Sequence, residues 1–179
     1  MKRFLTIACV SLFVCAGLQA QVSGSINRGA PTVTNTIAMG DHKMEVSYTA
    51  IRFGEGQWER VLDNENMHER FNQLAERRPM GTVKTSCDVI TAGKSVPAGN
   101  YTMFFTVSTR SGWILNLKPE KGDTIRWRLV LTDTDKKQDC MHISLSPSAE
   151  NGVCSLGVAF GSKSVTVPVR VADSDDSDG

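Results

Sequence analysis

Apolar and polar side chains alternate along most of the chain, which is the pattern of β-strands with one buried face. The clearest case is residues 125–131, where every second residue is apolar and Arg126 and Arg128 lie on the other face. Similar alternation occurs in about nine segments, near residues 32–39, 42–49, 83–89, 101–107, 113–117, 125–131, 141–145, 154–160 and 165–171. Short strands at regular spacing predict an all-β domain, an antiparallel β-sandwich or jelly-roll-like fold.

Glycine, proline and polar residues mark the connections between these strands. Residues 92–99, with Gly93, Pro97 and Gly99, predict a turn before a strongly apolar strand. Residues 132–138 are polar and predict a loop, and Gly161-Ser162 predicts a tight turn. Pro168 lies on the polar face of the last strand and predicts that this strand is at a sheet edge.

The period changes between residues 57 and 78, where apolar residues recur every three or four positions. This spacing predicts one amphipathic helical insertion with a break near Asp63-Asn64. Asn66 followed by Glu69 resembles a capping box, and Pro79 ends the segment. We expect the insertion to pack on the sheet, and the alternative is a mobile cover over a site.

The two ends of the chain differ from the middle in composition. Residues 1–20 have a short basic start and a long apolar run, which predicts a cleaved secretory signal peptide. Residues 172–179 are acidic and predict a disordered tail. We therefore expect a single domain over residues 28–171, exported to the periplasm or the extracellular space, without a membrane span after cleavage.

The charge of the expected domain is close to neutral. Without the basic signal residues and the four aspartates of the tail, 20 basic and 19 acidic residues become 18 and 15. No basic stripe with interleaved aromatic residues is present, so the sequence does not predict nucleic-acid binding.

Three cysteines lie outside the signal peptide. Cys87 is on the apolar face of its segment and is expected to be a buried thiol. An exported protein can carry a disulfide, and Cys140 and Cys154 are the natural pair. The alternation places Cys140 on a polar face and Cys154 on an apolar face, however, so a bridge between them needs a shifted register.

Candidate catalytic and metal-binding groups are sparse. The three histidines have no ligand spacing, and Cys140 with His142 supplies only two of the ligands that zinc or copper needs. The sequence therefore predicts no cofactor. It also lacks a nucleophile-elbow motif and a phosphate-binding glycine loop. A glycosidase requires two carboxylates on opposite sides of a cleft. The sequence does not show which two of the available acids could face each other: Glu45, Glu55, Asp88 and Glu120.

A binding surface is the remaining possibility. Lys84, Arg126 and Arg128 fall on polar strand faces and are expected to line a sheet surface, with His142 as a further member. Four aromatic residues are alternative candidates for a stacking platform: Trp58, Tyr101, Trp113 and Trp127. Trp113 and Trp127 lie on the apolar faces of their strands, which favours packing in the core.

One strand–turn unit carries a family resemblance. It comprises Gly93-Lys94-Ser95-Val96-Pro97-Ala98-Gly99-Asn100-Tyr101, then Met103-Phe104-Phe105 and Trp113-Ile114-Leu115-Asn116-Leu117. This unit resembles the bacterial domain of unknown function 2911 family, with weaker similarity in 45–49, 69–72 and 161–171. The sequence departs from that family in 75–80, where many members carry a Trp-Arg-Thr-Gly-Ala-Asn-like segment, so it resembles a divergent member. The resemblance implies bacterial origin and export, and the family has no assigned activity or catalytic residues to carry over.

We expect from these observations an exported, non-enzymatic β-sandwich module that binds a glycan, a peptide or another envelope protein. The alternative is a hydrolase with its site between the helical insertion and the sheet.

Overall fold

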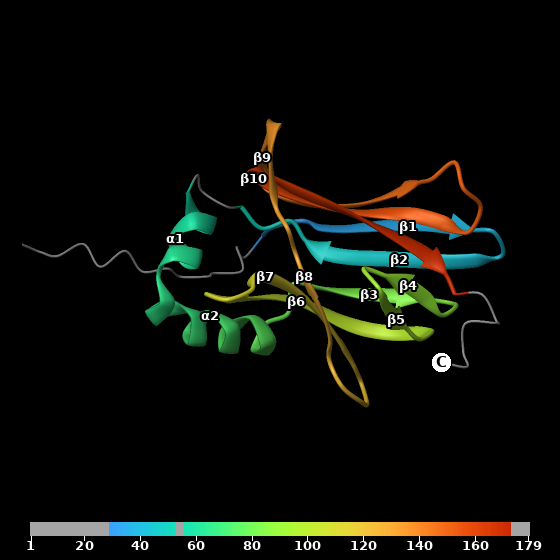
Figure 1. The fold of residues 1–179 in the computed structure, drawn as a ribbon, viewed down its shortest axis with the longest axis horizontal. Coiled ribbons are helices and arrows are strands. Elements are labelled where there is room, and N and C mark those ends of the chain that lie inside the picture. The colour runs from blue at the N-terminus through green and yellow to red at the C-terminus, as the bar shows by residue number, and fades with distance from the viewer. Residues whose placement is uncertain (1–28, 53–55, 173–179) are drawn as a thin grey trace, which may run out of the picture.

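The structure, a computed structural model, describes residues 29–52 and 56–172, apart from the side chain of Trp58. Two antiparallel sheets pack face to face (Figure 1), which confirms the predicted β-sandwich. The larger sheet has the order β1-β2-β3-β6-β7-β8 and the smaller has the order β5-β4-β10-β9. The strands are β1 (Thr32–Met39), β2 (His42–Thr49), β3 (Gly81–Thr85), β4 (Val89–Thr91), β5 (Lys94–Val96), β6 (Gly99–Ser108), β7 (Gly112–Pro119), β8 (Ile125–Arg128), β9 (Thr132–Pro147) and β10 (Val153–Val171).

The core lies between the two sheets and is built from the alternating apolar residues. Val46, Met103 and Leu115 are buried in the larger sheet, while Ile143 and Val169 are buried in the smaller. Two contacts join the layers: Phe105 packs edge-on against Phe160 with ring centroids 6.0 Å apart, and the Trp127 indole N–H donates to the Thr91 carbonyl at 3.1 Å.

One side of the sandwich is joined by backbone and side-chain hydrogen bonds. The Met141 N–H of β9 donates to the Ile51 carbonyl just after β2, at 2.8 Å. The Asn35 amide of β1 donates to the Ile143 carbonyl of β9 at 2.6 Å. The polar side chain of Asn35 is thus satisfied at the seam between the two sheets.

The predicted strand over residues 83–89 is in fact two strands in different sheets. β3 belongs to the larger sheet and β4 to the smaller, with the crossover at residues 86–88. The Thr85 hydroxyl donates to the Cys87 carbonyl at 2.7 Å, a local side-chain-to-backbone bond at the crossover. Cys87 is therefore half-buried in a connection and is not a core residue, contrary to the prediction.

The predicted turn over residues 92–99 contains a strand of its own. Ala92 and Gly93 have positive φ angles of 46° and 73° and form the tight turn, after which β5 pairs back on β4. The second corner is held by Tyr101, whose hydroxyl donates to the Pro97 carbonyl at 2.6 Å. The Asp88 carboxylate accepts the Ala98 N–H at 2.7 Å. The segment therefore carries the chain from the smaller sheet back to the larger.

β10 turns back on itself at Gly161, which has a φ of 47°. Its two arms lie side by side, because the Val171 N–H donates to the Gly152 carbonyl at 2.9 Å (Figure 1). The arm after Gly161 also pairs with β4 through Val169, so it lies inside the sheet. The edge position predicted from Pro168 is therefore wrong. Pro168 is tolerated because pairing with β4 starts one residue later.

The predicted loop over residues 132–138 is part of β9. Thr132 and Asp133 pair with Ser164 and Lys163, and the register then shifts so that residues 134–137 arch outward. An ion pair between the Lys163 ammonium and the Asp133 carboxylate, at 2.7 Å, holds the base of this arch. The polar composition predicted a loop over all of 132–138 and did not reveal the pairing at Thr132, Asp133 and Gln138.

The helical insertion forms two helices, α1 (Gln57–Asp63) and α2 (Glu65–Arg77), at one end of the sandwich (Figure 1). The break near Asp63-Asn64 is confirmed. The capping box is wrong, because α2 begins at Glu65 and places Asn66 inside the helix. His68 joins the helices instead: its Nε2 donates to the carbonyls of Val61 and Leu62, at 2.9 and 3.0 Å. These carbonyls belong to the last turn of α1, where helical partners are missing.

α2 closes an edge of the larger sheet. β3 pairs with β6 only as far as Met103, so no strand of the described residues pairs with the rest of β6 on that side. The Asn72 side chain fills part of this gap: its carbonyl accepts the Val107 N–H at 2.8 Å, and its amide donates to the Val107 carbonyl at 2.9 Å. Next to it, Phe71 meets Trp113 edge-on at 5.3 Å. The helix is thus fixed to the sheet by directional as well as apolar contacts.

Candidate functional site

The described part of the chain holds no group of three or more potential metal ligands. Cys140 is half-buried and His142 is exposed, and the two lie on β9 without a third ligand. Over the same residues, no helix has the length and apolar character needed to cross a bilayer.

All three thiols of the described residues are free. Cys154 lies opposite Pro147 in the β9–β10 ladder and Cys140 lies further along β9, so the two sulfurs have no direct pairing. Burial raises the pKa of the Cys154 thiol and is also the main cause of the raised pKa of Cys87. A raised pKa keeps a thiol protonated and a poor nucleophile.

The cavity between the two sheets is too small for a ligand. This cavity has a volume of about 20 Å³, which is room for roughly one water, whereas ligand pockets measure about 300–1,000 Å³. Its lining is dominated by apolar side chains, among them Met44, Val89, Leu115, Trp127 and Val169.

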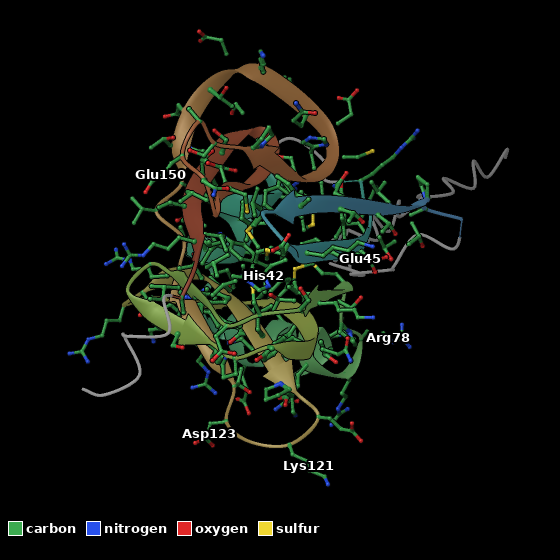
Figure 2. All side chains as sticks on the ribbon, turned by 90° about the vertical axis from the view of Figure 1, so that its right-hand side faces the viewer. His42, Glu45, Arg78, Lys121, Asp123 and Glu150 are labelled. Carbon is green, nitrogen blue, oxygen red and sulfur yellow. The ribbon has the colours of Figure 1, made fainter. Side chains whose placement is uncertain are left out.

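The carboxylates considered for hydrolysis lie in different places. Glu45 is on β2, Asp88 holds the turn at Ala98, and Glu120 follows β7 in an exposed loop. Glu55 lies outside the described residues, as do the predicted signal peptide over 1–20 and the acidic residues after 172. In Figure 2 the labelled charged residues, such as Arg78, Lys121 and Glu150, point outward from separate parts of the molecule.

Three of the four predicted surface residues share one face. Lys84 on β3 and Arg126 and Arg128 on β8 are exposed on the outer face of the larger sheet. Two strands, β6 and β7, separate β3 from β8, so Lys84 is at least about 14 Å from the arginine pair. The register offsets them further, because Lys84 lies opposite Asn100, whereas Arg126 is in line with Asn116 and Phe104. His142 is exposed on β9 in the other sheet and does not belong to this face.

A row of polar side chains crosses the same face from β1 to β7. The register aligns residues from five neighbouring strands: Thr34, Ser47, Thr82, Thr102 and Lys118. The Thr34 hydroxyl donates to the Ser47 hydroxyl at 3.0 Å, which fixes one end of the row. The row was not predicted, because alternation shows that each residue points outward and cannot show which ones are neighbours.

Acidic residues compensate some of the cations of this face. The Lys118 ammonium bonds the Glu76 carboxylate of α2 at 2.7 Å. This hydrogen bond and charge, with a smaller contribution from Arg126, lower the pKa of Glu76. Lys84 lies opposite Glu45 in the register. Among the ion pairs of the described residues, none includes Arg126 or Arg128. The two arginines of β8 are therefore adjacent exposed cations of this face that form no ion pair among the described residues.

The described aromatic residues provide no exposed stacking platform on this face. Trp113 and Trp127 are only 2% and 6% exposed, as expected from their place on apolar faces. The side chain of Trp58 lies outside the described residues. The outer face thus offers hydroxyls and cations rather than rings.

No family model matches this chain, and neither the curated proteins nor the solved structures include a significant match. The resemblance to a bacterial family through residues 93–105 therefore stays a prediction, and the fold and the surface are the basis for the function.

Proposed function

We propose that this protein is an exported, non-enzymatic binding module that holds a partner bearing carboxylate or phosphate groups on the outer face of its larger sheet. The observation that carries the proposal is the pair Arg126 and Arg128, exposed on one face of β8 with no ion pair among the described residues. Guanidinium groups bind carboxylate and phosphate in a forked geometry.

Other polar groups of this face fit the same role. Lys84 adds a third cation on this face, and the hydroxyls of Thr82 and Thr102 can donate to or accept from a bound partner. The expected domain carries more basic than acidic residues, so an anionic partner is attracted rather than repelled.

The hydrolase alternative has less support. Its site would lie between the helices and the sheet, where Phe71, Trp113 and Asn72 make direct contacts. We identify no convergent pair of polar side chains there among the described residues.

Titration with polyglutamate tests the binding proposal, with polylysine as the control polymer. We expect polyglutamate to bind and the double variant Arg126→Gln/Arg128→Gln to bind roughly 5- to 10-fold more weakly, because each exposed ion pair contributes about 0.2–1 kcal/mol. The matched control is Arg170→Gln, which removes an exposed arginine from β10 in the smaller sheet. Equal affinity in all three proteins would contradict the proposal.

N-terminal sequencing of the protein recovered outside the cytoplasm tests export, and the expected start is near Gln21.

A further inference from the structure

The outer edge of β8 carries backbone groups that no described strand pairs. β8 is the last strand of the larger sheet, next to β7 alone. The Leu129 N–H donates to the Trp113 carbonyl at 2.8 Å, which makes these two residues a hydrogen-bonded pair of the antiparallel ladder. Such pairs alternate along the strand. Trp127 therefore directs its N–H and C=O toward β7, while Arg126 and Arg128 direct theirs outward.

The side chains along this edge alternate in character. Arg126 and Arg128 are exposed on the outer face, and Val130 continues the same parity with 66% of its surface exposed. No other large apolar residue of the described chain is exposed to this degree. The opposite face of the segment, with Trp127 and Leu129, is buried in the core. The edge thus combines outward backbone groups, two cations and an apolar side chain in a single line.

We propose that β8 receives an extended, acidic peptide segment of a partner protein as an additional strand of the sheet. This inference rests on the proposed function and names the class of partner. The backbone groups of Arg126 and Arg128 supply the ladder bonds, and side chains set the specificity. Acidic residues of the peptide lie opposite the two arginines, and an apolar residue lies opposite Val130.

A partner peptide fits this edge better than a second copy of the chain. Two β8 edges paired with each other would place arginines against arginines, which is unfavourable. The chain's own acidic tail contains no apolar residue after Ala172, so it cannot supply the contact to Val130.

The first experiment uses a short capped peptide in which glutamate alternates with valine. The control peptides are a lysine–valine version and an acidic version N-methylated on alternate amides, which keeps the charge and removes backbone donors. We expect the acidic peptide to bind the full mature protein, the lysine peptide not to bind, and N-methylation to weaken binding about 10-fold.

The second experiment uses two variants at one position. Arg128→Gln removes the charge, whereas Arg128→Pro removes the charge and the outward N–H. We expect a loss of affinity of about 3-fold for R128Q and a further loss of about 5-fold for R128P, with little change in melting temperature because that N–H is not bonded to β7. If R128P does not fold, the N-methylated peptide decides the question on the unaltered protein.

The outcomes separate this inference from the proposed function. Equal binding of the acidic peptide and its N-methylated form overturns strand addition, while loss of polyglutamate binding in the double arginine variant still supports the function. Failure of every acidic probe to bind overturns both. A gain in peptide affinity after removal of residues 173–179 shows that the tail occupies the edge of β8. A dimer that R128P abolishes shows that a second copy of the chain occupies it. Either result overturns the inference that a partner peptide binds there.

Discussion

Asn72 shows how one side chain can complete a sheet. Its side-chain amide N–H donates to the Val107 carbonyl at 2.9 Å, and its side-chain carbonyl accepts the Val107 N–H at 2.8 Å. These bonds take the place of a neighbouring strand, because β3 does not extend to this part of β6. We expect Asn72→Ala to lower the free energy of unfolding by about 1–3 kcal/mol, because it leaves a buried strand without its partners. Urea denaturation measures this change.

The neighbouring residue provides the control. Gln73 is exposed and bonds only Glu69 of the same helix, at 3.1 Å. We expect Gln73→Ala to change the free energy of unfolding by less than about 0.5 kcal/mol. If both variants lose the same small amount, the Asn72 pairing contributes no stability.

Gly81 is required for a different reason, the close approach of strands at the start of β3. A Cβ at this position would collide with the Ser47 carbonyl and lie 2.9 Å from the Tyr48 Cα. We expect Gly81→Ala to destabilise the protein by about 2–3 kcal/mol, since the backbone of β2 must move. Gly112→Ala is the comparison, because its Cβ has open space and only the φ of 65° opposes it, at about 1–2 kcal/mol. A smaller effect at Gly81 than at Gly112, measured by thermal melting, contradicts this assignment.

Among the elements, the two helices depend on each other through His68. Both partners of its Nε2 are carbonyls, so that nitrogen carries the proton and donates. We expect His68→Ala to speed amide exchange in α1 more than in α2, because the last turn of α1 loses its donor. His42→Ala, in an exposed residue at the start of β2, should leave exchange in α1 unchanged. Hydrogen exchange followed by NMR distinguishes the two results.

At the scale of elements, the sequence predicted the strands correctly where alternation of apolar and polar residues alone determines the structure. Alternation placed β1, β2 and the two arms of β10 correctly, because each has one face in the core. The alternation failed at residues 86–88, where the apolar–polar pattern continues although the chain passes from the larger sheet to the smaller. It also failed at residues 132–133, whose pairing depends on Lys163 and Ser164 far along the chain. Sheet membership is a non-local property, and no local pattern encodes it.

The whole molecule decides which outward residues become neighbours. Parity alone placed Lys84, Arg126 and Arg128 on polar faces. The strand order then separates Lys84 from the two arginines and assigns His142 to the other sheet. The polar row through Thr82 and Thr102 likewise exists only because five strands align in register. A candidate surface can thus be predicted residue by residue, whereas its geometry requires the topology.

Three buried or half-buried groups make the free energy of unfolding of the whole molecule decrease at alkaline pH. Burial is the main cause that raises the pKa of the Cys87 thiol, the Cys154 thiol and the Tyr101 phenol above their usual values. In each case the nearby negative charge or the loss of water disfavours the ionised form of the folded protein. The unfolded chain has no such environment and ionises at ordinary pH values.

The sign of the effect follows from the protons bound in each state. Below about pH 8.5 the thiols are protonated in both states, and their contribution to stability is fully present. Above it the unfolded chain loses protons that the folded protein retains, so the free energy of unfolding falls by up to about 1.4 kcal/mol per pH unit for each group, until the folded pKa is passed. Urea denaturation in a reducing buffer at several pH values measures this slope. We expect Cys154→Ala to make the slope shallower, whereas Val158→Ala, also buried on β10, lowers stability at every pH and keeps the slope. An unchanged slope in Cys154→Ala would show that this thiol ionises alike in both states.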